Sequence, residues 1–271
     1  MSTILVPTDF SEVASNAAIY AAKMASDIQA DIVLLHAYNI PISLSEVPMP
    51  LLSDEEMREA SHEGLENVAA MLRKEGFQGA IRFEIGKGDF VSVLQETIET
   101  VQPLIVLMGI TGKSEFETLL MGSNTFGAIR NLMVPVMVVP REASFRPVKR
   151  IAVALDLKNM KETIPAEQLL DMSGAMGATV HFVHIDSGND YPNSDTAIHL
   201  DALKHAFPDA VCHFSDNLSL VDGLNNYVYE NGIDLLVMFP RKHNFFELLF
   251  NSSSTRKMAL HTNVPLVTMH R

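Results

Sequence analysis

The sequence predicts an α/β fold of two tandem, doubly wound domains, each with a five-stranded parallel sheet that carries helices on both faces. One observation is that short runs rich in Val, Ile and Leu alternate with longer segments of helical periodicity. Because the short runs lack strict apolar–polar alternation, they are typical of parallel strands buried on both faces. The other observation is an internal repeat. Residues 104–108 match residues 234–238 at an offset of 130, and this offset continues without a gap through Pro135 and Pro265.

The first copy supplies five strands and four helices in alternation. Its strands are expected near residues 3–8, 31–37, 80–85, 104–108 and 136–139, and its helices near residues 12–28, 54–75, 89–101 and 123–132. Asp9 and Ser11 are candidate caps for the first helix, which has Glu12 in its first turn. Ser53 and Glu56 form a capping-box pattern that predicts the start of the second helix.

The second copy repeats this strand pattern near residues 150–155, 179–185, 210–214, 234–238 and 265–269. Between the copies, segment 140–147 holds two prolines and three charged residues, which indicates a short linker. The domains are therefore expected at residues 1–143 and 148–271. Runs 136–139 and 266–269 close the two copies as apolar edge strands, and open edges invite pairing. We expect them to pair with each other as a pseudo-dimer within one chain, with a further homodimer left open.

Composition excludes several classes of function. Apolar residues make up 47% of the 271-residue chain, and no apolar run approaches the roughly 18 residues of a membrane span. The net charge of −13 disfavours nucleic acid or an anionic membrane surface as the main partner. The single cysteine, Cys212, rules out an intramolecular disulfide and a cysteine-clustered metal site. With an N-terminus that lacks a signal-peptide pattern, these features favour a cytoplasmic protein.

Segment 109–125, GITGKSEFETLLMGSNT, carries the strongest indication of a ligand. An apolar strand ends in two glycines, and a nine-residue spacer separates them from a further glycine and a serine. These four residues are Gly109, Gly112, Gly122 and Ser123. Glycine lets an anion approach the main chain, and a helix that begins at Ser123 would add free N–H groups and the Thr125 hydroxyl. The pattern predicts a phosphate site, and the alternative is a long loop with ordinary turn glycines and a helix cap.

Further candidate residues follow the other strands of the first copy. In an open α/β sheet, ligands bind at the carboxyl ends of the strands, near the switch in strand order. In the first copy these ends are marked by Pro7-Thr8-Asp9, by Ala37, by Gly86-x-Gly88, and by Met108 before the 109–125 segment. The Asp9 carboxylate has the chemistry to accept hydrogen bonds from a purine amino group or a ribose hydroxyl, and equally to cap the following helix. The residues alone leave both roles open.

These motifs give the chain a resemblance to the universal stress proteins, in a tandem form that spans nearly all of the sequence. The family's ATP-binding pattern, G-x2-G-x9-G-[S/T], matches the glycines and serine above, and its strand signatures match Pro7-Thr8-Asp9 and Leu34-Leu35-His36. The resemblance implies ATP, alone or with Mg²⁺, as the ligand, with the adenine held by Asp9 and the Ala37 backbone. The residues that it implies for ribose and phosphates are Gly109, Gly112, Gly122, Ser123, Asn124 and Thr125.

The chain departs from the family pattern in two places. Thr111 stands where ATP-binding members often have histidine, which bears on the triphosphate contacts. In the second copy, Phe239, Lys242 and Ser252 replace the three glycines. Because Phe239 and Lys242 bring side chains to positions where the backbone would approach an anion, we expect one ATP per chain, bound in the first copy.

The histidines of the second copy do not form a metal-binding pattern. His181 and His184 lie three residues apart on one expected strand, so they should face opposite sides of the sheet and cannot share a metal ion. No HExxH motif is present. His199, His205, His213 and His261 lie nearby in the sequence and leave zinc as an alternative, but we expect no metal site.

The leading interpretation is an ATP-binding regulatory protein of the stress response, in which the nucleotide changes conformation or the choice of an unidentified protein partner. A slow ATPase or phosphotransferase using the same pocket is one alternative, with at most weak hydrolysis because no dedicated catalytic base is visible. A scaffold that binds no nucleotide is the other.

Overall fold

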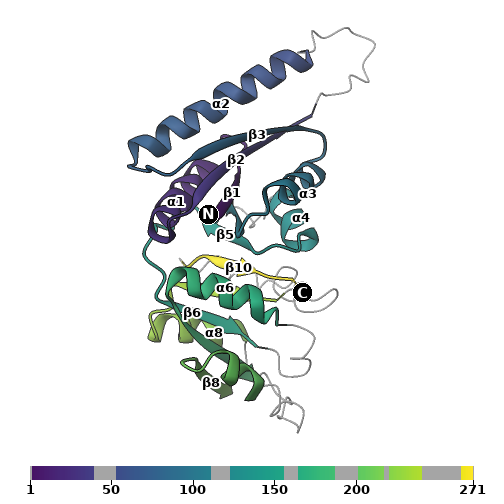
Figure 1. Ribbon diagram of the computed structural model, residues 1–271. Coiled ribbons are helices and arrows are strands. Elements are labelled where there is room, and N and C mark those ends of the chain that lie inside the picture. The colour runs from purple at the N-terminus through teal and green to yellow at the C-terminus, as the bar shows by residue number, and fades with distance from the viewer. Residues whose placement is uncertain are drawn as a thin grey trace.

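A computed structural model describes residues 2–39, 53–110, 123–155, 164–186, 201–216, 220–239 and 264–270. Strands and helices alternate along the chain and build two similar halves (Figure 1). The first half contains β1 (Thr3–Pro7), α1 (Glu12–Ile28), β2 (Asp31–Tyr38), α2 (Asp54–Lys74), β3 (Ile81–Lys87), α3 (Phe90–Val101), β4 (Ile105–Ile110), α4 (Ser123–Asn131) and β5 (Val136–Pro140). The second half contains β6 (Arg150–Ala154), α6 (Ala166–Met176), β7 (Thr179–Asp186), β8 (Val211–Asp216), α8 (Leu220–Glu230), β9 (Leu235–Met238) and β10 (Leu266–Thr268).

The strands of the described residues form one sheet in the order β3-β2-β1-β4-β5-β10-β9-β6-β7-β8. Neighbouring strands are parallel within each half, and β1 and β6 lie at the centres of their halves. The order of the second half is the reverse of the first, as expected for two related units that meet along one edge. The predicted fold class, two tandem α/β units each with five parallel strands, is confirmed.

The two halves meet where β5 pairs with β10. This pair is antiparallel, with Met137 of β5 opposite Val267 of β10. The predicted pairing of the two closing strands is therefore confirmed. Each strand supplies hydrogen-bonding groups to the other, so neither leaves an apolar edge open at the middle of the sheet.

Side chains of the second half reinforce this junction. Three of them hydrogen-bond to backbone carbonyls between the last turn of α4 and the start of β5. The bonds join Gln168 Nε2 to the Met133 carbonyl at 3.4 Å, Thr268 Oγ1 to the Val136 carbonyl at 3.4 Å, and His270 Nε2 to the Ile129 carbonyl at 2.6 Å. The second half thus holds the helix and strand that close the first half.

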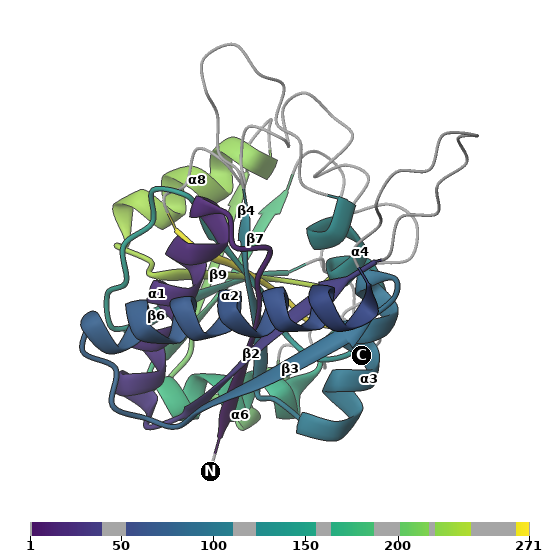
Figure 2. The ribbon, with the colours of Figure 1, turned by 90° about the horizontal axis from the view of Figure 1, so that it is seen from above.

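The helices cover the two faces of the sheet unequally. On one face, α1, α2 and α6 share a single apolar core that continues across the junction, so that Ala21 of α1 and Met172 of α6 belong to the same cluster. On the other face, α3 and α4 cover one cluster in the first half, and α8 covers a separate one in the second. Figures 1 and 2 show α2 lying across the outer strands of the first half.

Two local features differ from the expectation from sequence. β4 extends through Gly109 and Ile110, because Gly109 pairs with Val139 of β5 instead of opening a loop. The linker is packed: Ala143 is buried, and the Asn16 side chain of α1 donates hydrogen bonds to the carbonyls of Pro140 and Ala143. The domain limits at residues 143 and 148 stay a prediction.

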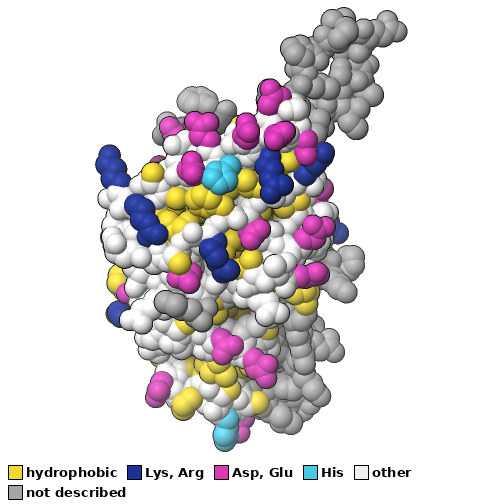
Figure 3. Space-filling view, turned by 45° about the horizontal axis from the view of Figure 1, so that its top comes forward, with side chains coloured by type: hydrophobic (Ala, Val, Ile, Leu, Met, Phe, Trp, Pro, Cys, Tyr) yellow, Lys and Arg dark blue, Asp and Glu magenta, His cyan; other side chains and the backbone are white. Residues whose placement is uncertain are grey.

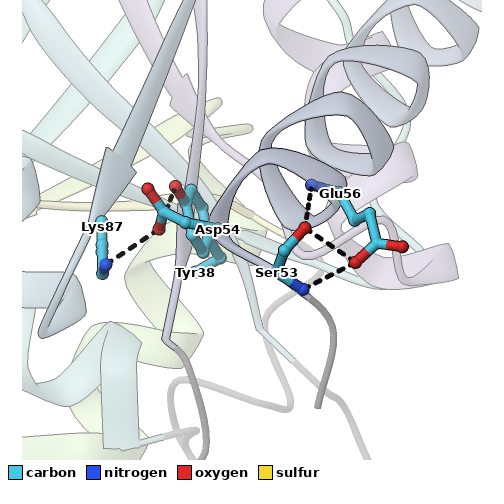
Figure 4. Close-up of polar contacts among 5 residues, drawn as sticks. All are labelled: Tyr38, Ser53, Asp54, Glu56 and Lys87. Carbon is cyan, nitrogen blue, oxygen red and sulfur yellow. Dashed lines mark hydrogen bonds and ion pairs between the residues drawn. The ribbon is translucent and has the colours of Figure 1, made fainter. Parts of the chain in front are cut away.

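The start of α2 is fixed to the ends of two strands (Figure 4). Asp54 Oδ1 accepts a hydrogen bond from the Tyr38 hydroxyl at 3.1 Å and forms an ion pair with Lys87 Nζ at 2.9 Å. The predicted capping box is present, since Ser53 Oγ accepts from the Glu56 N–H at 3.2 Å and Glu56 Oε2 accepts from the Ser53 N–H at 2.7 Å. β2, β3 and α2 are therefore tied together at this corner.

The outer face of α2 is strongly acidic, as Figure 3 shows at the top of the molecule. Its exposed carboxylates include Asp54, Glu55, Glu59, Glu63 and Glu66.

Among the helices that the structure describes, none combines the length with the apolar composition that crossing a bilayer requires.

The continuous core predicts that the two halves unfold together. The chain has no tryptophan, so a single introduced one reports on its own half. We expect Phe83→Trp in β3 and Phe214→Trp in β8 each to give a urea unfolding curve by fluorescence that coincides with the curve by circular dichroism. Comparing the two signals within one variant removes any effect of the substitution on stability. Separate midpoints in either variant would mean that the halves unfold independently.

The Asp54 cluster predicts a dependence of stability on acid. Lys87, with the Tyr38 hydroxyl, holds the pKa of the Asp54 carboxyl below its usual 3.8. Because the folded state lowers this pKa, the contribution is fully present above pH 3.8 and is lost as the pH falls through the folded value. We expect Asp54→Asn to lower the free energy of unfolding at pH 7 more than Glu55→Gln, the same change of charge one residue later. Urea unfolding at low pH should bring the two variants together, and a gap that persists there would contradict this assignment.

Candidate functional site

A pocket of about 210 Å³ opens at the carboxyl ends of the central strands of the first half. It lies between β1 and β4, where the chain leaves β1 toward one side of the sheet and later returns on the other, so it occupies the switch point of the strand order. The residues that line it are Pro7, Thr8, Asp9, Ser11, Val13, Ala14, Ala37, Phe90, Met108, Gly109, Asn124 and Thr125.

The turn between β1 and α1 forms one wall. Thr8 is buried, and its N–H donates to the Leu35 carbonyl of β2 at 2.8 Å. Asp9 is exposed, and its Oδ1 accepts from the Ser11 N–H at 3.0 Å. Ser11 is the cap of α1, because its Oγ accepts from the Ala14 N–H at 3.2 Å. Both Asp9 and Ser11 are candidate caps by sequence, and the structure gives the role to Ser11.

A histidine at the end of β2 braces this turn. His36 Nδ1 lies 2.8 Å from the Thr8 carbonyl, and since a carbonyl only accepts, Nδ1 carries the proton. The second half repeats the contact, with His184 Nδ1 at 3.1 Å from the Leu155 carbonyl. The matching histidines of the internal repeat thus have a structural role, because each ties its strand to the turn that follows the neighbouring strand.

Gly109 lets α1 approach β4 closely. A Cβ placed on Gly109 would lie 2.6 Å from both Val13 Cγ1 and the Val13 carbonyl oxygen, much closer than real contacts allow. The glycine therefore seats the first turn of α1 against the strand and directs the N-terminus of the helix toward the pocket. On the other side, Thr125 Oγ1 donates to the Gly109 carbonyl at 3.4 Å, which places α4.

The remaining predicted site residues lie along α4 or outside the described part of the chain. Asn124 and Thr125 line the pocket, and α4 begins at Ser123. Gly112 and Gly122 lie outside the described residues, as do Lys242 and Ser252 of the second half. Among the described residues, the structure thus brings the β1 turn, Ala37, the end of β4 and the start of α4 around one space.

Four of the lining residues are not predicted as site residues by the sequence: Ser11, Val13, Ala14 and Phe90. Ser11 is recognisable there only as a cap. Val13 and Ala14 fit the apolar pattern of α1, and Phe90 begins α3. The sequence could nonetheless have indicated the residues of α1, because the first turn of a helix that follows a central strand borders the switch point.

The pocket combines two helix N-termini with an acidic rim. The N-terminal ends of α1 and α4 carry the partial positive charge of their helix dipoles, which favours anions. The carboxylate of Glu12, in the first turn of α1, is paired with Arg141 at 2.7 Å, an exposed pair that salt will screen. The Asp9 carboxylate is then the acidic group that borders the pocket itself.

The second half differs at the matching position. Phe239 follows β9 as Gly109 follows Met108 of β4, and its side chain is buried in the core that lies under α6. The helix α6 has 11 residues where α1 has 17, and no side chain caps its start. The second half thus has a buried phenylalanine side chain at the position where the first half has a glycine.

The described residues contain no group of three or more His, Cys, Asp or Glu side chains placed to hold a metal ion. His181 and His184 are both buried, and their side chains belong to opposite faces of β7. Burial, with Arg150 nearby, lowers the pKa of His181, whose Nδ1 lies 2.9 Å from the Tyr227 hydroxyl. This histidine is a neutral, hydrogen-bonded core residue.

Comparison with known families decides where the chain belongs. Residues 1–140 match the model of the universal stress protein family, and this is just over half of the chain. The chain belongs to the universal stress protein family. A curated relative, the universal stress protein MJ0531 of Methanocaldococcus jannaschii, is 29% identical over 140 residues, which cover 51% of this chain and 81% of the relative. The resemblance inferred from the strand and glycine motifs is thus confirmed.

Solved structures extend the likeness to the whole chain. A universal stress protein from Archaeoglobus fulgidus superposes with a TM-score of 0.72 at 20% identity, over 99% of this chain and 98% of the other. A putative universal stress protein from Pseudomonas aeruginosa gives a TM-score of 0.55 at 13% identity, over 100% and 93% of the two chains. At these identities the likeness shows the fold, and it includes the second half that the family model does not cover.

The close contact at Gly109 predicts a large effect of one methyl group. We expect Gly109→Ala to lower the free energy of unfolding by about 1–3 kcal/mol, because the new Cβ forces the first turn of α1 away from β4. Gly174→Ala is the matched control, since a Cβ on this helical glycine of α6 meets nothing within 4 Å. It should raise stability by about 0.5–1 kcal/mol. Urea unfolding of both variants checks this, and equal effects at the two positions would refute the packing role of Gly109.

Proposed function

We propose that the first half of this universal stress protein binds one ATP, and that nucleotide occupancy regulates its interactions during the stress response. The observation that carries the proposal is the position of the pocket, at the switch point of the sheet and between the N-termini of α1 and α4. Helix N-termini that converge on one space offer N–H groups and positive potential to phosphates.

The lining residues suggest how the nucleotide would lie. Asp9, whose carboxylate accepts hydrogen bonds, suits the adenine amino group or the ribose hydroxyls, and Ala37 lines the same pocket. Asn124 and Thr125 at the start of α4 suit the phosphates. The pocket of about 210 Å³ is smaller than the roughly 300–1,000 Å³ of most ligand sites, so we propose that it holds only part of the nucleotide. Gly112 and Gly122 complete the motif that would hold the phosphates.

Charge favours a role for Mg²⁺. Residues 1–143 contain 19 Asp and Glu against 9 Lys and Arg, a net charge of −10. Such a domain repels a triphosphate at long range, so affinity must come from short-range N–H contacts and from a divalent cation that offsets charge on the phosphates. We propose modest affinity that improves with Mg²⁺.

The second half supports a stoichiometry of one. Phe239 fills the position of Gly109 with a buried ring, and Lys242 replaces a second glycine of the motif. We propose that this half binds no nucleotide and serves as a structural or regulatory partner of the first.

Calorimetric titration of the full chain with ATP tests the proposal. We expect about one site per chain, with tighter binding when Mg²⁺ is present. Asp9→Ala should weaken binding by roughly 10–100-fold, as expected for a lost hydrogen bond to a charged group. Lys242→Ala is the control for the second half and should bind as the unchanged protein does.

Two results would overturn the assignment. No heat of binding with ATP at high protein concentration would leave the scaffold interpretation in place. If Lys242→Ala loses binding while Asp9→Ala keeps it, the site belongs to the second half. Analysis of products after overnight incubation separates a binding protein from a slow ATPase.

A further inference from the structure

We propose that Phe10 is a positioning residue for the nucleotide site, and that helix α2 acts on the Asp9 carboxylate through it by way of Gly64. This inference rests on the proposed nucleotide function. Phe10 itself does not line the pocket, but it stands between two residues that do, Asp9 and Ser11. Any movement of Phe10 is therefore passed to the pocket through one peptide bond on either side.

The backbone at Phe10 is in a conformation that needs support. Its φ is +65°, in the left-handed region that bulky residues rarely adopt. The turn is held locally by the Phe10 N–H, which donates to Thr8 Oγ1 at 3.0 Å. A strained residue that persists beside a binding site is held there by its surroundings, and it points to a functional constraint.

The ring of Phe10 is held on one side by His36. The two rings are stacked, with centroids 4.4 Å apart and planes 25° apart. The same imidazole donates from Nδ1 to the Thr8 carbonyl at 2.8 Å. His36 thus fixes both Thr8, at the start of the turn, and the side chain of Phe10. It does so from the end of β2, which is held between β1 and β3 in the sheet.

Gly64 of α2 lies against the tip of the Phe10 ring. A Cβ placed on Gly64 would lie 2.5 Å from Phe10 Cζ, and two further ring carbons lie within 2.8 Å. Glycine in the middle of a helix weakens the helix, so its presence here needs a reason, and the Phe10 ring supplies one. The helix cannot retreat freely, because Asp54 ties its start to Tyr38 and Lys87 (Figure 4).

Phe10, His36 and Gly64 therefore form a latch on the turn that carries Asp9. Phe10 is 36% exposed, so burial of apolar surface alone does not explain the arrangement. Its geometric consequence is specific: the position of α2 sets the ring, the ring sets the turn, and the turn sets the Asp9 carboxylate. Through this chain of contacts, whatever binds the acidic face of α2 would alter how the first half holds a nucleotide.

A double-mutant cycle in the full chain tests the latch. Gly64→Ala should weaken ATP binding by about tenfold, while the melting temperature changes little because the helix propensity of alanine offsets the cost of displacing the partly exposed ring. Phe10→Ala should weaken binding to a similar extent. In the Phe10→Ala background, Gly64→Ala should have no further effect, since no ring remains for the methyl group to displace. Phe10→Ala should likewise add little to Asp9→Ala.

The control is Gly174→Ala, the same helical substitution in open space, which should bind ATP as the unchanged protein does. A second readout needs no nucleotide. The amide resonance of Ser11, whose N–H binds Asp9, should shift in Gly64→Ala and not when Gly64→Ala is added to Phe10→Ala. Normal ATP affinity and an unmoved Ser11 resonance in Gly64→Ala would overturn the latch. Failure of the unchanged protein to bind ATP would instead refute the nucleotide function, and a shifted Ser11 resonance would still show the contact.

Discussion

The antiparallel pairing of β5 with β10 is the constraint on which the rest of the structure depends. Each half ends in an apolar strand. Without a neighbour, its outer backbone groups would be left unpaired, and the exposed edge would promote association with other chains. Their pairing turns two five-stranded units into one sheet and makes the core under α1, α2 and α6 continuous. It also brings His270 to the last turn of α4, so the second half steadies a helix whose first turn borders the pocket.

Within the first half, two contacts place helices α1 and α4 beside the pocket at the end of this sheet. The absence of a side chain at Gly109 seats the first turn of α1 against β4, and the Thr125 hydroxyl places α4 on the same glycine. Both helices then present their N-termini to a space that the sheet has already opened by its change of strand order. The residues that line the pocket are positioned mainly by the backbone geometry of the strands and helices that carry them.

Much of this could be predicted from the sequence. The apolar runs and the offset between the copies locate the strands to within about two residues, because burial on both faces leaves a strong pattern. The strand ends then locate the pocket. The contact of Phe10 with Gly64 leaves no such pattern, since it joins residues 54 positions apart through one ring and one missing Cβ. The cap at Ser11 is ambiguous in the sequence because Asp9 has equal capping chemistry, and only the hydrogen bonds distinguish them.

Phe239 has a wider consequence for how such proteins can diverge. When two identical subunits associate, every substitution appears in both, so a change that closes one site closes the other. Joining the copies in a single chain removes this symmetry while it keeps the shared sheet. The second copy has a buried aromatic ring at the position where the first copy has a glycine packed against α1. Covalent linkage thus allows the two copies to differ at matching positions while they share one sheet.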